Sequence, residues 1–361
     1  MLISRIGFLC SEHELDRERR GYFKALRRQE IEVFCLPRPA TASSELLELP
    51  SDDMTLLLQP DVARRLPHGL VNSKIPTACF SIDTFHYTSY RTQISMLFDY
   101  AFVFHPGFDE IFQKAGHPKA YCLPHAVECE LFDQPELERI YDIGWVGRLD
   151  GEFYKLRRRV INVLKSSFTM NDIGRYYNPE EMAQIYRQSK IVINLSRDDY
   201  LKDANLRCFE VMAAGALLIT PIPSELSSLG FTEGLHYIAF KEENELYELV
   251  EFYLNHPQKR NEISNAARSL VLGEHTYDNR AQTMLGIVEE GAGKLFAPAR
   301  HWEKSKIHKL YFGYWSANIL ITPMMSEWMN LVRLSPVTAL RLLPTVVKLC
   351  LITLKIQLSL E

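Results

Sequence analysis

The sequence lacks the patterns that mark several common classes of protein. Its 361 residues include seven cysteines, but no Cys-x-x-Cys pair and no cluster of cysteine and histidine at zinc-site spacing. No Asp-x-Asp motif follows an expected strand, and there is no internal repeat or low-complexity segment. Scattered cysteines in odd number favour reduced, buried thiols in a cytosolic protein. A zinc-binding, disulfide-rich or repeat architecture is therefore not expected.

Long apolar runs are also missing. No stretch of about 18 residues is both uncharged and apolar enough to predict a transmembrane helix. The N-terminal MLISRIGFLC places Arg5 within a short apolar run, which is typical of a first strand and not of a signal peptide. A formal net charge of -4 argues against a general nucleic-acid-binding protein. We expect a cytoplasmic protein without a nucleic-acid partner.

Positive charge is concentrated near the C-terminus. The segment from Trp302 onwards contains seven Lys or Arg and three Glu, a net charge of +4, which leaves -8 on the rest. Arg341, Lys348 and Lys355 recur every seven residues, close to two helical turns, on an otherwise apolar pattern. This pattern predicts a helix that lies on a membrane surface, with its cations toward anionic headgroups. Packing against the protein itself or a second copy is the alternative.

Short apolar runs alternate with helical patterns along most of the chain. This alternation predicts parallel sheets covered by helices on both faces, with ligands beyond the carboxyl ends of the strands. In the first half we expect strands at 3–10, 31–36, 53–59, 76–83 and 100–105, and a helix at 15–29. In the second half we expect strands at 141–149, 167–174, 190–196 and 216–220, and helices at 153–165, 180–189, 206–214, 246–255 and 258–272.

The domain prediction follows from a change of character in the middle of the chain. The stretch 123–140 contains two prolines and no strong strand pattern, as expected of a connection between domains. We predict two doubly wound, Rossmann-like domains in tandem. Their bounds are 1–125 and 141–285, with a linker at 126–140 and a helical tail at 286–361 that crosses back in part to the first domain.

Two segments of the second half have the residue types of an anion-binding site. Gly147 and Arg148 end an expected strand, where glycine permits close approach to the backbone and arginine can bind phosphate oxygens. Ser196 ends another strand, and a helix begins near Asn205, where free N–H groups and the helix dipole favour a diphosphate. A tight turn with a solvated arginine would explain the first segment equally well.

Glu210 is a carboxylate within a helix that otherwise has small and apolar side chains. One turn from the start of the helix, it can accept hydrogen bonds from two neighbouring hydroxyl groups, such as those of a ribose. The alternative is that Glu210 only complements the helix dipole. Spacing alone does not distinguish the two interpretations.

The second half resembles a known enzyme family. The matching pieces are DIGWVGRL at 142–149, YRQSKIVINLS at 186–196, NLRCFEVMAAGALLITP at 205–221 and EHTYDNR at 274–280, and YCLPHAVECELF precedes them. They are similar to the glycosyltransferase group 1 superfamily (GT4-like), and most similar to its branch of CgeB-like proteins. The resemblance implies a GT-B fold, in which two Rossmann-like domains face a cleft.

The resemblance also implies roles for individual residues. Arg148 and the helix start would hold a donor diphosphate, Glu210 would hold the ribose, and the loop 174–176 would contact the base. The implied donor-binding residues are Gly147, Arg148, Arg175, Tyr176, Ser196, Asn205, Leu206, Arg207 and Glu210. No metal and no cofactor is implied, because arginine and the helix dipole would act on the diphosphate.

The chain departs from the family pattern at a few positions. Lys202, followed by Asp203, stands where many relatives have a second glutamate, eight residues before Glu210. The lysine that often follows the strand arginine has three candidate counterparts, which are Lys155, Arg157 and Arg158. His275 and Tyr277 match the family motif as donor or cleft residues, but they would serve equally as packing beside the helix N-cap Thr276.

Candidate catalytic residues of the first domain follow its expected strands. Asp83 and His105 are the preferred pair, since a carboxylate or histidine can accept or orient a hydroxyl proton. Glu12 and His13 follow the first strand, where an interdomain cleft would open. His86 and His125 occupy comparable positions, and an ordinary structural role is the alternative for each histidine.

The expected function is that of a hexosyltransferase-type enzyme on the inner face of the cell membrane. It would move a sugar from a nucleotide diphosphate sugar to a glycan or lipid-linked glycan, with retention of configuration and without a metal, as the resemblance implies. One alternative is a nucleotide-sugar epimerase of the same fold, which needs no acceptor. Another is a non-catalytic scaffold in envelope polysaccharide assembly.

Overall fold

The computed structural model describes residues 3–36, 55–60, 66–67, 69–318 and 321–358, and the side chains up to residue 352. Its contacts divide the chain into two compact units. The first unit contains Met1–Glu14, Glu30–Cys122 and Ile287–Glu361, and the second contains Leu15–Gln29 and Leu123–Gly286.

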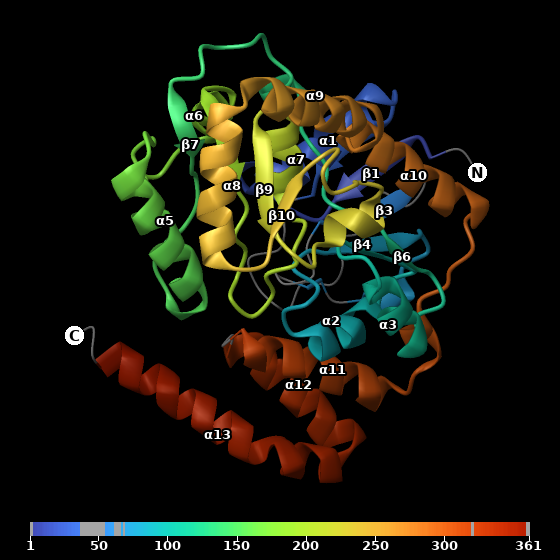
Figure 1. The fold of residues 1–361 in the computed structure, drawn as a ribbon. Coiled ribbons are helices and arrows are strands. Elements are labelled where there is room, and N and C mark those ends of the chain that lie inside the picture. The colour runs from blue at the N-terminus through green and yellow to red at the C-terminus, as the bar shows by residue number, and fades with distance from the viewer. Residues whose placement is uncertain (1–2, 37–54, 61–65, 68, 319–320, 359–361) are drawn as a thin grey trace. The chain divides into compact units, whose positions relative to one another are not determined.

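The first unit contains a six-stranded, entirely parallel sheet (Figure 1). The strand order is β2–β1–β3–β4–β5–β6. The strands are β1 (Arg5–Phe8), β2 (Glu32–Cys35), β3 (Leu56–Gln59), β4 (Thr77–Ser81), β5 (Tyr100–Val103) and β6 (Ala120–Cys122). β3, β4 and β5 are buried along their whole length, as expected of parallel strands covered on both faces.

Helices from the first third of the chain and from its C-terminal end complete the first unit. These are α2 (Thr88–Ser95), α3 (Phe108–Lys114), α11 (Lys304–Ala317), α12 (Ile321–Leu334) and α13 (Pro336–Leu358). Tyr311, Phe312 and Trp315 of α11 are buried in the same apolar core as Leu97 and Phe98. The tail from Ile287 onwards is therefore part of the core of this unit and not a loose appendage.

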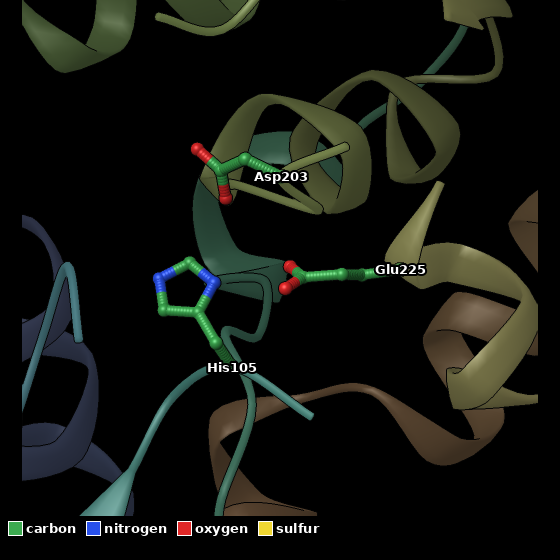
Figure 2. A group of neighbouring side chains, drawn as sticks. All are labelled: His105, Asp203 and Glu225. Atoms are coloured by element: carbon green, nitrogen blue, oxygen red, sulfur yellow. The ribbon is translucent and has the colours of Figure 1, made fainter. Parts of the chain in front are cut away.

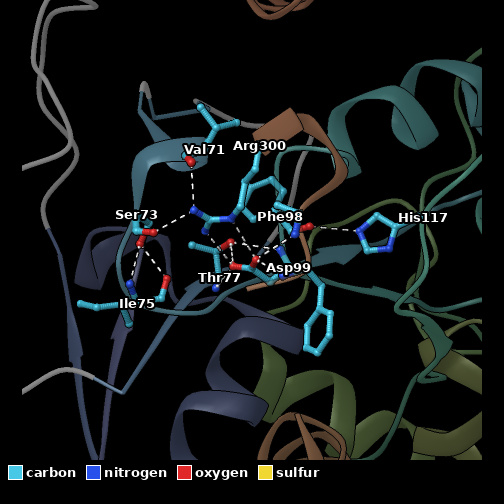
Figure 3. A network of polar contacts seen from close by, with 10 residues as sticks. Val71, Ser73, Ile75, Thr77, Phe98, Asp99, His117 and Arg300 are labelled. Carbon is cyan, nitrogen blue, oxygen red and sulfur yellow. Dashed lines mark hydrogen bonds and ion pairs between the residues drawn. The ribbon is translucent and has the colours of Figure 1, made fainter. Parts of the chain in front are cut away.

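A buried carboxylate ties the tail to the first sheet (Figure 3). Asp99, which is fully buried, accepts hydrogen bonds from the backbone N–H and the hydroxyl of Thr77, both at 2.8 Å. Its other oxygen accepts from the backbone N–H groups of Phe296 and Ala297, at 2.6 and 2.9 Å. Arg300 lies 3.3 Å from both carboxylate oxygens and donates to the carbonyls of Val71 and Ser73. The charge of Asp99 is thus both paired and hydrogen-bonded.

The second unit contains a four-stranded parallel sheet in the order β10–β9–β8–β7 (Figure 1). The strands are β7 (Tyr141–Gly144), β8 (Ser189–Ile193), β9 (Leu217–Pro221) and β10 (Ile238–Phe240). The helices are α1 (Arg17–Arg28), α4 (Cys129–Phe132), α5 (Lys155–Ser167), α6 (Pro179–Arg187), α7 (Leu206–Ala213), α8 (Glu243–Asn255), α9 (Pro257–Glu274) and α10 (Tyr277–Glu290). Two parallel sheets with covering helices confirm the predicted α/β class.

Helix α1 groups with the second unit, although its sequence lies within the predicted first domain, 1–125. Arg20 and Lys24 contact the carboxylate of Glu128 at 2.8 and 2.6 Å. On the apolar side, the rings of Tyr22 and Tyr277 meet edge to face at 5.1 Å. Local periodicity predicted the helix correctly but could not predict which unit it joins, because its partners lie about a hundred residues or more further along the chain.

One expected strand is wrong. The segment 167–174 forms a single bridge, between Met170 and Ile143, instead of a strand. Asn171 ends this short stretch and hydrogen-bonds with the backbone of Trp145 through both its side-chain oxygen and its side-chain nitrogen, each at 2.8 Å. Side-chain bonds thus replace the ladder that the apolar pattern suggested.

Candidate functional site

Helix α7 places Glu210 inside the second unit. The side chain of Asn205 caps the helix by accepting from the N–H of Arg207 at 3.1 Å, and Gly215, with φ of 72°, ends it. The helix packs against β9 and α9, and Glu210 is only 5% exposed. The predicted start and end of this helix are confirmed.

The carboxylate of Glu210 is incompletely satisfied. Its Oε1 lies 3.8 Å from the guanidinium of Arg17, the first residue of α1, whereas its Oε2 is buried with no hydrogen-bond partner among the described residues. Burial raises the pKa of Glu210, and the positive charges of Arg17 and Arg207 oppose that increase. A buried acceptor in this state can accept hydrogen bonds from hydroxyl groups of a ligand.

Arg207 connects the start of α7 to the loop after β7. Its guanidinium lies over the ring of the buried Trp145, 4.5 Å from the centroid, and donates to the carbonyl of Val146 at 2.9 Å. A second bond reaches the side-chain oxygen of Asn194 at 3.2 Å. Gly147 has φ of 156°, and a Cβ there would lie 2.6 Å from Nη2 of Arg207. The glycine therefore allows the arginine to lie against the loop backbone.

A second arginine, which is buried, lies on the same tryptophan. Arg157 of α5 donates to the carbonyls of Leu195 and Arg148, at 2.8 and 3.0 Å, and its guanidinium is 5.6 Å from the centroid of the Trp145 ring. Burial and the neighbouring Arg207 lower the pKa of Arg157 to about 10. Within the described part of the chain, neither arginine forms an ion pair with a carboxylate. Two arginines without a carboxylate partner, beside a helix start, form a site suited to an anion.

Arg148, the arginine singled out from the sequence, has a different environment. Its side chain is 68% exposed and forms an ion pair with Asp150 at 2.8 Å. Its backbone carbonyl, not its guanidinium, belongs to the cluster around Trp145. Of the three candidates for the family lysine, Arg157 is the buried one, whereas Lys155 and Arg158 are exposed.

The loop between β8 and α7 takes part in a buried polar network. Ser196 donates to Asp203 at 2.6 Å, and Asn205 lies 3.5 Å from the same carboxylate. Glu225, which follows β9, accepts from the hydroxyl of Tyr200 at 2.5 Å and from the N–H of Ala204 at 3.1 Å. Asp203 and Glu225, whose side chains are drawn in Figure 2, are 4% and 6% exposed. These bonds fix the loop that leads into the start of α7.

The side chain of Lys202 and the loop 174–176 lie outside this network, although the carbonyl of Lys202 accepts from the N–H of Glu225 at 2.9 Å. Lys202, at the position of the family glutamate, is exposed and directs its ammonium toward the ring of Tyr200, 5.2 Å from the centroid. Arg175 forms an ion pair with Glu181 at 2.7 Å, and Tyr176 is 88% exposed. The described structure therefore does not bring Arg175 or Tyr176 into contact with Arg157 or Arg207.

His275 and Tyr277 are packed in the second unit. His275 lies against Phe231, and its Nδ1 is 2.7 Å from Arg280. Burial and the charge of Arg280 lower the pKa of His275 to about 4, so the imidazole is neutral at ordinary pH. Tyr277 is 3% exposed and lies so close to Gly21 of α1 that a Cβ there would be 2.3 Å from its ring. Thr276 caps α10 through Asn279, as predicted.

The candidates of the first unit lie after the carboxyl ends of β1, β4 and β5. Glu12 and His13 are exposed in a short 3-10 helix after β1, and Asp83 is exposed in a turn after β4 with φ of 49°. His105 follows β5, is 1% exposed and meets the ring of Phe85 at 5.1 Å. The parallel sheet thus presents all four residues at one edge.

Arg17 and Trp145 were not predicted as site residues. The sequence around Arg17 reads as an ordinary charged helix, and its ion pair is with a residue almost two hundred positions away. Trp145 had the pattern of a buried strand residue. It is buried, directly after the end of β7, and its ring also lies against two arginines. No local pattern indicates this cluster, because its members come from separate segments of the chain.

Comparison with known proteins identifies the second unit. Residues 146–286 match the glycosyl transferase-like family. The spore protein CgeB of Bacillus subtilis is 23% identical over 286 residues, which cover 68% of this chain and 86% of that protein. The matched family segment contains the Gly147 turn, the loop after β8 and all of α7.

Solved structures share the fold across most of the chain. Anabaena HepE in complex with UDP-glucose has a TM-score of 0.57 at 12% identity, with 79% of this chain and 99% of that chain covered. A glycosyltransferase from Rickettsia africae has a TM-score of 0.56 at 12% identity, with 80% and 98% covered. Sucrose-phosphate synthase from Thermosynechococcus elongatus has a TM-score of 0.53 at 13% identity, with 80% and 98% covered. The chain therefore has the GT-B fold of these glycosyltransferase structures, and its residues 146–286 are similar to the glycosyl transferase-like family.

Proposed function

We propose that this enzyme transfers a sugar from a nucleotide diphosphate sugar to a glycan or lipid-linked glycan. The observation that carries the proposal is Glu210, a buried carboxylate with one oxygen left without a partner in the described structure. An unpaired buried acceptor is costly unless a ligand satisfies it, and the paired hydroxyls of a ribose have the required donors. UDP-glucose in the complex with HepE is a ligand of this class.

The diphosphate would lie at Arg157, Arg207 and the start of α7. As the bond between the sugar and the diphosphate breaks, negative charge increases on the departing oxygens. The guanidinium groups of Arg157 and Arg207 and the free N–H groups of the helix would stabilise this charge, because they are already in place before the reaction begins. Gly147 would allow the diphosphate to approach the backbone. In this proposal the backbone carbonyl of Arg148 holds Arg157 in place. The side chain of Arg148 would reach the diphosphate only after breaking its ion pair with Asp150.

Further details of the reaction are proposed from the family resemblance. We propose retention of configuration, no metal and no cofactor, with Asp83 and His105 acting on the acceptor side. The enzyme would work in the cytoplasm at the inner face of the cell membrane. Within the described residues, no helix is long and apolar enough to cross a membrane.

The proposal is tested by nucleotide release from UDP-, GDP- and dTDP-linked sugars, with and without glycan and lipid-linked acceptors. We expect one donor class to release its nucleotide faster when an acceptor is added. Arg207→Gln should lower kcat/KM by about a hundredfold or more, because one preorganised donor to the developing charge is removed. Arg159→Gln is the matched control, since Arg159 is exposed on α5 and pairs with Glu243.

The same assay separates the rival functions. An epimerase would convert the sugar of the donor into its epimer, and the rate would not change when an acceptor is added. A scaffold would bind nucleotide but release none under any condition, and Lys202 in place of the family glutamate is the feature that favours it. Turnover that is unaffected by Arg207→Gln would contradict the assignment of the diphosphate site.

A further inference from the structure

Helix α13 has two apolar faces. On one face, Ala339 and Val346 are 2% and 6% exposed and belong to the core of the first unit. Leu342, Leu349 and Cys350 pack against the same core. The helix is thus anchored to the unit, and α12 supports it through the indole of Trp328, which donates to the carbonyl of Ala339 at 3.0 Å.

The other face of α13 exposes large apolar side chains. Val337, Leu340 and Leu351 are 63%, 68% and 54% exposed, and Val347 is 49% exposed. Their spacing of three, seven and four residues places them along one side of the helix. Leu340, Leu343, Pro344, Val347, Lys348, Leu351 and Ile352 line a shallow groove of about 690 Å³. Scattered exposed apolar residues are ordinary, but a continuous stripe on one helix indicates a partner.

The charges beside this stripe have one sign. Arg341 and Lys348 are exposed and lie two turns apart, along the edge of the apolar stripe. The 23 residues of α13 include no Asp or Glu. Lys355 continues the same spacing, although its side chain lies outside the described ones. An apolar stripe bordered only by cations fits a partner that is apolar in its interior and negatively charged at its surface.

We propose that the apolar stripe of α13, together with Arg341 and Lys348, binds the surface of an anionic lipid bilayer. The helix would lie in the plane of the interface, with Leu340, Val347 and Leu351 among the acyl chains. A second copy of the chain fits less well, because a two-fold contact through this stripe would bring the cations of both copies together. The proposal deepens the membrane location proposed above, and it does not depend on the donor site.

The test is sedimentation of the full-length protein with vesicles. One set contains phosphatidylcholine alone, and the other contains phosphatidylcholine with phosphatidylglycerol. We expect binding to the anionic set that weakens with salt, and little binding to the neutral set. Arg341→Gln/Lys348→Gln should weaken binding to anionic vesicles about thirtyfold at low salt, since each basic residue contributes about fivefold.

A second variant tests the apolar contribution. Leu340→Gln/Val347→Gln/Leu351→Gln should abolish sedimentation with both vesicle sets while α13 keeps its buried face. Ile111→Gln/Lys114→Gln on α3 is the control, because it removes one exposed apolar residue and one exposed cation from the same unit. Truncation of α13 is unsuitable, because it would also remove core residues.

Three outcomes would overturn the proposal. The first is equal binding of the wild type to neutral and anionic vesicles, or none to either. The second is unchanged binding of the charge variant. The third is a wild-type dimer in light scattering that the triple variant converts to a monomer, with no vesicle binding. Nucleotide-induced stabilisation of the same variants checks that they fold and that the donor site is intact, so that failure of the proposed function is seen separately.

Discussion

At the residue scale, Glu210 is a carboxylate whose ionisation depends on its neighbours. Burial raises its pKa above the ordinary 4.5, and the negative charge of Glu128 raises it further. The positive charges of Arg17 and Arg207 lower the same pKa. Tyr186 and Tyr277 also surround it. Ribose binding requires the ionised carboxylate as a double acceptor. Arg17, which comes from α1, is therefore a positioning residue that acts through Glu210.

We predict that Arg17→Gln moves nucleotide binding to higher pH. Without this charge the pKa of Glu210 rises further, so a larger fraction of the free protein holds the proton at a given pH. Affinity for the nucleoside diphosphate should then reach its plateau at a higher pH than in the wild type. Calorimetric titrations from acidic to neutral pH measure this. Arg27→Gln, on the same helix, is the control, because Arg27 lies over Phe23.

The same group determines how stability changes with pH. A raised pKa means that the folded protein retains the Glu210 proton longer than the unfolded chain does. The contribution of this group to the free energy of unfolding is therefore greatest at low pH and declines as pH rises from 4.5 through the raised pKa. Arg17→Gln should steepen the decline, and Glu210→Gln should remove it. A flat difference between Glu210→Gln and the wild type across this range would contradict the assignment.

Replacement of Gly147 by alanine should lower both the stability of the protein and its affinity for the diphosphate. An alanine at this position would need φ of 156°, and its Cβ would lie 2.6 Å from Nη2 of Arg207. We expect Gly147→Ala to cost about 1–3 kcal/mol in the free energy of unfolding and to weaken diphosphate binding by displacing Arg207. Gly273→Ala in α9 is the control, since no atom lies within 4 Å of that Cβ, and it should stabilise by roughly 0.5–1 kcal/mol. Denaturant unfolding with and without nucleotide gives both quantities.

At the element scale, each unit is held together by charges that link distant segments. In the first unit Asp99 joins β4 to the segment that enters the tail. In the second unit α1 is tied by Arg20 and Lys24 to Glu128, and by Arg28 to Asp278. The Asp99 bonds are buried, whereas the Arg28 pair is exposed to water, so Asp99 should contribute far more to stability.

We predict that Asp99→Asn destabilises the first unit by about 3 kcal/mol. The amide nitrogen cannot accept from the backbone N–H groups that the carboxylate serves, and Arg300 would lose its charged partner. Glu110→Gln removes an exposed ion pair with Lys114 on α3 and should change stability by less than about 0.5 kcal/mol. Thermal unfolding measures the difference. A similar effect of both variants would show that the Asp99 network adds little.

At the scale of the whole molecule, the alternation of apolar runs was sufficient to predict the α/β class. Parallel strands are buried on both faces, so each appears in sequence as a continuous apolar run, as in LLL of β3 and VI of β8. The cap at Asn205 and the stop at Gly215 were likewise predictable, because both act within one turn of α7.

The assembled site was less predictable. Local patterns indicated Glu210, and the family resemblance indicated that Arg207 lies near the diphosphate. Arg17 and Trp145 acquire their roles only when separate elements meet around β7 and α7. The exposure of Arg148 also depends on a neighbour, Asp150, whose ion pair no periodicity predicts. Sequence patterns report what is close along the chain, and this site consists of groups that are close only in the folded protein.

The most direct measurement is the thermal stability of the full-length protein in the presence of UDP, GDP, dTDP, CDP or CMP. A ligand that binds the folded state raises the unfolding temperature by mass action. We predict stabilisation by one nucleoside diphosphate, reduced at least tenfold in affinity by Glu210→Gln and retained by Glu274→Gln, an exposed glutamate of the same unit. Stabilisation that Glu210→Gln leaves unchanged, or none by any nucleotide, would contradict the donor site proposed at Glu210.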